Sequence, residues 1–162
     1  MGNNHSVDNL LLSLLKKILL YRLTRNIDKE LQNRKISHAK LSAISSRGGN
    51  WFNRAFNELE DMRVTTFIRT ITAINKKTSG RDNNPVDVNH ILDEELFKIS
   101  SVFIDLATNG AEYLLNNDPE IRQFFRDIKF YVDALKALDS VLSAEELQSY
   151  EQILNRISTE RM

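Results

Sequence analysis

A row of hydrogen-bonding side chains recurs at helical spacing near the middle of the first half of the chain. Asn50, Asn53, Arg54 and Asn57 stand at i, i+3, i+4 and i+7, so a helix would carry them on one face. An asparagine amide can donate and accept together at the edge of adenine, and an arginine can form two hydrogen bonds to guanine. The row favours a helix that reads bases in a major groove, and the solvated face of an amphipathic helix is the alternative.

Two short helices joined by a turn would position this row. Ser37 is a typical N-cap for the first helix, and Gly48-Gly49-Asn50 permits a sharp turn because glycine adopts backbone angles that other residues resist. The second helix is predicted over residues 51–59, and a third over residues 64–74. The apolar face opposite the polar row consists of Phe52, Ala55, Phe56 and Leu59. The order of these elements predicts a helix-turn-helix.

The spacing of residues along this segment resembles the Xre/Cro type of phage and plasmid repressor, over roughly residues 20–78. The resemblance needs no gap and rests on Ser37, His38, Leu41, Phe52, Phe67 and Ile74. It implies that His38 contacts a phosphate or a base, and that Asn50, Asn53 and Arg54 lie on the recognition helix.

The turn departs from the pattern of that family. Ser42 stands at the usual small position of the first helix, Ser46 at the turn glycine and Arg47 at the buried apolar position. We therefore expect a turn of different construction. Lys35, Lys40 and Arg47 flank the row and are predicted to contact phosphates. The predicted DNA-binding residues are His38, Lys40, Arg47, Gly49, Asn50, Asn53, Arg54 and Asn57.

Charge is distributed unevenly although the formal net charge is zero. Residues 1–79 hold 14 Lys and Arg against 6 Asp and Glu, and residues 80–162 hold 8 against 16. A basic half attracts phosphate, since each neutralised phosphate releases a bound counterion. This segregation favours a nucleic-acid partner for the first half, with ordinary solvated charge as the alternative.

The composition predicts an all-α protein: a helix-turn-helix DNA-binding domain over residues 1–79, then a small helical domain over residues 80–162. Only 5 Gly and 2 Pro interrupt the helical periodicity, and residues 76–88 form the one obvious linker. In the second half we expect three helices. The first spans 91–107 and stops at Asn109-Gly110, the second begins at Asp118-Pro119, and the third begins with a capping box of Ser143 and Glu146.

Several classes of function are disfavoured by the sequence. His5, His38 and His90 are scattered, and adjacent carboxylates such as Glu94-Glu95 diverge by about 100° on a helix. We therefore expect no enzyme activity, no metal and no cofactor. The apolar start of the chain is interrupted by Lys16 and Lys17, which argues against a membrane span. The absence of Cys fits a reducing cytoplasm.

Three functions remain open. The first is a transcriptional regulator, a repressor, whose basic half binds double-stranded DNA and whose acidic half forms a homodimer on an inverted repeat. The second is a phage protein similar to anti-CRISPR proteins that carry a helix-turn-helix. Its acidic half would inhibit a CRISPR effector nuclease by imitating nucleic acid, through Glu94, Glu95 and Asp105. The third is a purely structural helical bundle. The operator and the regulated genes are not encoded in this pattern.

Overall fold

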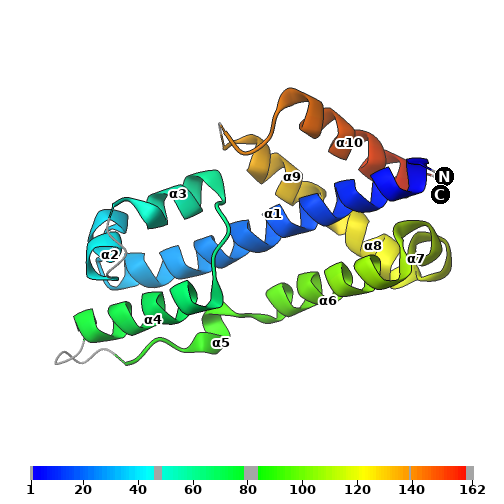
Figure 1. Ribbon diagram of the computed structural model, residues 1–162. Coiled ribbons are helices and arrows are strands. Elements are labelled where there is room, and N and C mark those ends of the chain that lie inside the picture. The colour runs from blue at the N-terminus through cyan, green and yellow to red at the C-terminus, as the bar shows by residue number, and fades with distance from the viewer. Residues whose placement is uncertain (1, 46–48, 79–83, 139, 160–162) are drawn as a thin grey trace. The chain divides into compact units, whose positions relative to one another are not determined.

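The computed structural model describes residues 2–45, 49–78, 84–138 and 140–159, with the backbone alone for residues 2–6. Within these ranges the chain is helical and contains no β-strand, which confirms the predicted all-α class (Figure 1). The helices are α1 Gly2–Asn33, α2 His38–Ile44, α3 Trp51–Glu58, α4 Val64–Thr78, α5 Val88–Ile91, α6 Glu94–Asn109, α7 Ala111–Asn117, α8 Pro119–Asp127, α9 Lys129–Lys136 and α10 Ala144–Thr159.

The chain divides into two compact units. Unit 1 comprises residues 1–19 and 97–162, and unit 2 comprises residues 20–96. This division differs from the boundary expected near residue 79, because the segment after residue 84 packs back onto unit 2. The amide of Val86 donates to Asn75 Oδ1 at 2.7 Å, and Arg34 donates to the carbonyl oxygen of Asn84 at 2.7 Å. Unit 2 therefore carries 13 Lys and Arg against 10 Asp and Glu, so the expected charge contrast shrinks to +3 against −3.

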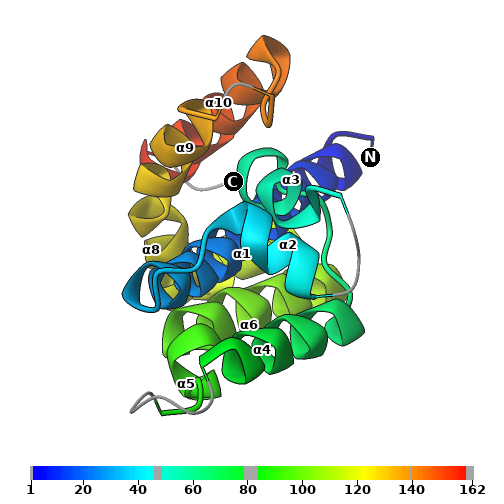
Figure 2. The same cartoon turned by 90° about the vertical axis from the view of Figure 1, so that its left-hand side faces the viewer.

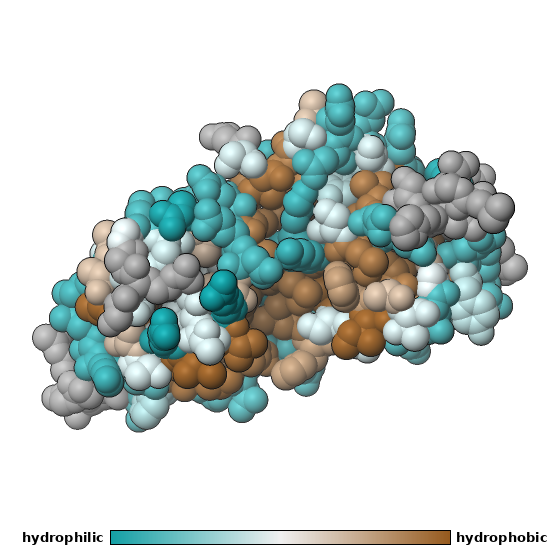
Figure 3. All heavy atoms as spheres, in the orientation of Figure 1, coloured by the Kyte–Doolittle hydropathy of each residue, from teal (hydrophilic) through white to brown (hydrophobic). Residues whose placement is uncertain are grey.

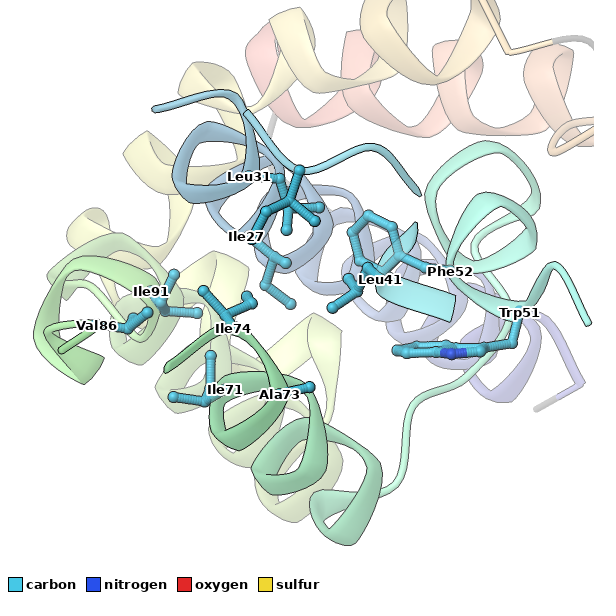
Figure 4. Close-up of a cluster of buried hydrophobic side chains, with 11 residues drawn as sticks. Ile27, Leu31, Leu41, Trp51, Phe52, Ile71, Ala73, Ile74, Val86 and Ile91 are labelled. Carbon is cyan, nitrogen blue, oxygen red and sulfur yellow. The ribbon is translucent and has the colours of Figure 1, made fainter. Parts of the chain in front are cut away.

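The core of unit 2 gathers one to three apolar side chains from each of the helices α1 to α5. Figure 4 shows Ile27 and Leu31 of α1 pointing toward Leu41 of α2 and Phe52 of α3. The buried side chains are Ile27, Leu31, Ile36, Leu41, Trp51, Phe52, Ile71, Ala73, Ile74, Val86 and Ile91. Burying each large apolar side chain stabilises the fold by about 1.5 to 3 kcal/mol, so these contacts set the relative positions of α2, α3 and α4 within the unit.

Several predicted helix starts and stops are confirmed. Ser37 caps α2, with its hydroxyl accepting from the amide of Lys40 at 3.1 Å. Asp118 caps α8 ahead of Pro119. The capping box before α10 is complete, since Ser143 and Glu146 exchange hydrogen bonds of 3.3 and 3.0 Å. Gly110 follows α6 with φ of +85°, a conformation that a side chain disfavours.

The prediction of three helices in the second half is wrong, because the described residues there form six, α5 to α10. The helix expected over 91–107 is α6, which begins at Glu94 after a break at Leu92-Asp93, and neither α5 before the break nor α7 was foreseen. The helix expected after Pro119 is divided into α8 and α9 at Ile128. Apolar periodicity could not reveal that second break, because Phe125, Ile128 and Val132 are all buried and continue one pattern across it.

Asp93 explains the first break and anchors unit 2. Its Oδ1 accepts from the amide of Leu96 at 3.0 Å and so caps α6. Its Oδ2 accepts from Arg22 at 2.8 Å and from the buried amide of Asn26 at 3.1 Å, both on α1. Asn26 also donates to the carbonyl oxygen of Ile91 at 2.8 Å. Burial works to raise the pKa of Asp93, but these hydrogen bonds outweigh it and lower the pKa below its ordinary value.

The first turns of α1 belong to unit 1 and are held there by polar contacts. Asp8 Oδ1 accepts from the amide of Ala111 at 2.8 Å, and Lys17 forms an ion pair with Glu146 of α10. The hydrogen bond from Lys17 lowers the pKa of Glu146, against the opposing effect of burial. Of the helices in the described ranges, α1 included, none has the length and apolar character that a bilayer crossing requires.

We predict that Asp93→Asn lowers the free energy of unfolding by about 1 to 2 kcal/mol at pH 7, since asparagine keeps the cap but loses the charged contact with Arg22. A carboxyl whose folded-state pKa is lowered stabilises the fold above its unfolded pKa of about 3.9, and this contribution disappears as the pH falls through the folded value. The difference from wild type should therefore become smaller as the pH falls from 7 toward 2, as urea unfolding at both pH values would show.

The matched control for this measurement is Asp133→Asn, which changes an exposed carboxylate on α9. It should leave stability unchanged within about 0.5 kcal/mol at either pH. An equal loss of stability at pH 7 and pH 2 in Asp93→Asn would contradict the electrostatic role assigned to Asp93.

Candidate nucleic-acid interface

Helix α3 is held against unit 2 by its apolar face. Trp51, Phe52 and Ala55 are buried, and Phe52 is completely inaccessible to solvent. Figures 1 and 2 show α2 and α3 next to each other beside the end of α1. The predicted second helix is thus present, with Leu59 as its C-cap in the left-handed conformation at φ of 54°.

Two buried serine hydroxyls of α2 fasten the beginning of α3. Ser42 Oγ accepts from the backbone amide of Phe52 at 3.2 Å, and Ser45 Oγ accepts from Trp51 Nε1 at 2.7 Å. The first amides of a helix have no partner inside the helix, and the N-cap Asn50 forms no side-chain cap bond here. Ser42 therefore supplies the acceptor from a neighbouring helix. A hydroxyl at this buried position therefore has a structural role within unit 2.

The turn between α2 and α3 is described only in part. Ser46, Arg47 and Gly48 lie outside the described residues, so the predicted phosphate contact of Arg47 stays a prediction. Gly49 is exposed and has φ of +63°, with no atom within 4 Å of the position that a Cβ would take. Glycine is favoured there by backbone conformation and not by crowding.

The outer face of α3 carries the predicted polar row. Asn57 Nδ2 donates to Asn53 Oδ1 at 2.8 Å, which uses one group of each amide and leaves the others available to a ligand. Arg54 lies 3.4 Å from the carboxylate of Glu60, and these side chains are 46% and 52% exposed. Asn50 is exposed at the start of the helix. The row therefore lies together on the surface of unit 2, as predicted for these four residues.

Carboxylates cluster where α3 ends. Glu58, Glu60 and Asp61 are all exposed within four residues of one another. They repel phosphate near the C-terminal end of the helix, whereas the beginning of the helix carries none. A polyanion would therefore approach α3 from its N-terminal half, where Asn50 and Asn53 lie.

His38 is half-buried and makes contacts within unit 2. Its Nε2 lies 2.6 Å from Oδ1 of Asp28 on α1, and its ring contacts the edges of Phe52 and Phe56 at centroid distances of 4.8 and 4.7 Å. This ring joins α1, α2 and α3 inside unit 2. The contact with Asp28 engages Nε2 of the ring, and the predicted contact of His38 with a phosphate or a base stays a prediction.

Arg25 positions the other end of α3, a role that the sequence did not reveal. Its guanidinium lies over the rings of Tyr21 and Phe56, at 4.1 and 3.7 Å from their centres, and donates to the carbonyl oxygen of Phe56 at 2.6 Å. Burial lowers the pKa of Arg25 from its ordinary value. The spacing of Tyr21 and Arg25 by four residues was the available signal, but the partner on α3 is distant in sequence.

The remaining predicted residues divide into two groups. Lys35 and Lys40 are exposed near the start of α2, where they are accessible to a polyanion. Glu94 and Glu95 lie in the first turn of α6 within unit 2, a position that a negative charge stabilises through the helix dipole. Asp105 is on the same helix but in unit 1, about 16 Å further along the axis. The predicted partner-binding role of these three carboxylates stays a prediction.

We predict that Ser42→Ala lowers the free energy of unfolding by about 1 to 2 kcal/mol, because it leaves the buried amide of Phe52 without an acceptor. The amide proton of Phe52 should also exchange faster with solvent. The neighbouring exposed residue provides a control, since Ala43→Ser should change stability by no more than about 0.5 kcal/mol. Equal stability and equal exchange in Ser42→Ala would contradict this role.

Comparison of this chain with models of known protein families, with curated proteins and with solved structures finds no match. The likeness to Xre/Cro repressors accordingly stays a prediction. The geometry of α2 and α3 and the chemistry of the residues that they expose are the basis for inferring the function.

Proposed function

We propose that this protein is a sequence-specific regulator of transcription that binds double-stranded DNA through α3. The observation that carries the proposal is the two-sided character of this helix. Trp51, Phe52 and Ala55 on one side are buried in the core. Asn53, Arg54 and Asn57 on the opposite side lie at the surface. These are the side chains that hydrogen-bond to base edges in a major groove.

The ion pair of Arg54 does not prevent this role. Exposed pairs of this kind contribute about 0.2 to 1 kcal/mol, whereas a two-pronged arginine contact with guanine supplies about 1 to 3 kcal/mol of discrimination. Arg54 can therefore exchange Glu60 for guanine at little cost. Asn53 and Asn57 offer amide groups to adenine from the same face, so the row has the chemistry to read adjacent base pairs.

A dimer is expected on charge grounds. Unit 2 has a net charge of only +3, and several of its arginines are engaged inside the protein, among them Arg22, Arg25 and Arg34. The 10 Asp and Glu of the unit offset most of the cations that remain, so one unit would bind DNA weakly at physiological salt. Two linked units gain affinity through effective concentration, and two-fold symmetry would require an inverted repeat.

The alternative of a nucleic-acid mimic that inhibits a CRISPR effector nuclease receives less support. Unit 1 has a net charge of only −3, and the carboxylates considered for that role lie in different units. A transcriptional regulator therefore fits these charges better than a nuclease inhibitor does. The structural-bundle reading is an outcome of the same experiment, since such a protein would enrich no sequence.

The deciding experiment is selection of binding sites from a random duplex library, combined with footprinting on the DNA upstream of the protein's own coding region. We expect an inverted repeat to be enriched and protected. Enrichment of no sequence, at low salt as well as physiological salt, would overturn the proposal.

On the selected site, Arg54→Ala and Asn53→Ala should each lose about 1 to 3 kcal/mol of discrimination at one base pair, while circular dichroism remains that of wild type. Arg126→Ala is the matched control, because it removes an exposed arginine from α8 of unit 1. If both α3 variants bind every single-base variant of the site as wild type does, α3 is not the reading helix.

Lys40 should contribute affinity without specificity. Lys40→Ala is predicted to weaken binding to all sequences alike, and to reduce the slope of log affinity against log salt by about one unit. Lys136→Ala on α9 removes a lysine of similar exposure from unit 1 and should leave the slope unchanged. A changed base preference in Lys40→Ala would show that this lysine reads bases.

A further inference from the structure

Helix α6 presents an apolar line to solvent within unit 1. Phe97 and Ile104 are 63% and 62% exposed, although they stand seven residues apart on one face. Ser101 lies between them on the same face and is also exposed. The opposite face of the helix is buried through Ile99, Val102 and Leu106. Figure 3 shows apolar side chains at the surface over α6. The helix is therefore apolar on both sides, which a fully solvated helix would not be.

Opposite charges flank this line at the same spacing. Lys98 and Asp105 are exposed and also stand seven residues apart, so they lie on one side of the apolar line. The ammonium of Lys98 is 5.9 Å from the ring centre of Phe124 on α8, which holds it beside the helix. At seven residues the two charges are about 10 Å apart along the axis, too far to pair within one copy.

We propose that this face of α6 is a two-fold interface with a second copy of the chain, in which the two α6 helices run antiparallel and cross at Ser101. A two-fold axis there brings Lys98 of one copy beside Asp105 of the other, and the same contact occurs twice. Phe97 of each copy then lies against Ile104 of the other. The small side chain of Ser101 permits the close approach of two packed helices, about 8 to 10 Å between axes.

The charges select this arrangement over a parallel one. In a parallel two-fold pair, Lys98 and Asp105 of one copy lie on the opposite side of the interface from those of the other, so neither residue meets an opposite charge across it. The antiparallel pair satisfies the apolar and the charged residues in one register. A single helix pair is a small interface, so we expect association in about the micromolar range. The interface is independent of DNA binding, because it uses residues of unit 1 and can be measured without DNA.

The test is a charge exchange followed by sedimentation equilibrium over a range of protein concentrations. Lys98→Asp and Asp105→Lys should each weaken self-association about tenfold or more, because each places like charges at both contacts. The double variant Lys98→Asp/Asp105→Lys should restore it. An equimolar mixture of the two single variants should form a heterodimer, since each copy then meets the opposite charge.

Several outcomes would overturn the interface. They are a monomer at every concentration, self-association that neither single exchange affects, and a double variant or a mixture that remains monomeric. Lys136→Asp on α9 is the control for a generic charge effect, and it should leave association unchanged. Far-ultraviolet circular dichroism distinguishes a folding defect from a lost interface. The mixture of the two single variants restores association only if both variants are folded.

A cross-link measures the same geometry directly. The chain contains no Cys, so Ser101→Cys introduces a single thiol. At a helix crossing of about 8 to 10 Å, facing Cα atoms come within the range of about 4.4 to 6.8 Å that a disulfide spans. Mild oxidation should give a covalent dimer from Ser101→Cys, in proportion to the population of dimer. Gln148→Cys on α10 should stay monomeric, and equal cross-linking of both variants would contradict the proposal.

Discussion

The carboxylate of Asp93 supplies a directional polar anchor for unit 2 beside its apolar core. It accepts hydrogen bonds from Arg22 and Asn26 of α1 and from the first turn of α6 at Leu96, so it joins segments about 70 residues apart in sequence. A partly buried carboxylate is costly unless donors surround it, and here they do. The same contacts hold α1 in place along the part of its length that supports α2 and α3. The proposed reading helix therefore rests on an electrostatic anchor remote from its own surface.

Helix α3 is positioned at its two ends by different chemistry. At its start, the hydroxyls of Ser42 and Ser45 satisfy a backbone amide and the Trp51 indole. At its end, Arg25 lies over the ring of Phe56 and binds its carbonyl oxygen. Buried polar contacts are directional, so they define the rotation of a short helix more sharply than apolar packing alone. The outward face of Asn53 and Arg54 follows from that rotation.

Several charged side chains of unit 2 stabilise its fold and are not available to a ligand. Arg22 and Arg25 of α1 and Arg34 after it donate to groups within unit 2, and exposed carboxylates lie near the end of α3. A surface with this balance would gain little affinity from phosphate alone. Specific base contacts through α3 would then supply part of the binding energy. Self-association through the apolar face of α6 would supply the rest by linking two copies of the chain.

Local patterns in the sequence determined the helical class, the caps at Ser37, Asp118 and Ser143, and the face of α3 that carries the polar row, because each depends on residues within one or two turns. The cap at Asp93 is equally local, since it accepts from the amide of Leu96, but the donors Arg22 and Asn26 lie on a distant helix and could not be identified from neighbouring residues. Nor did local patterns determine that the segment after residue 84 packs back onto unit 2, which removed most of the charge contrast. The inward placement of His38 and Arg25 also required tertiary partners. These features are decided by contacts between segments far apart in the chain, so they cannot be predicted from the pattern of neighbouring residues.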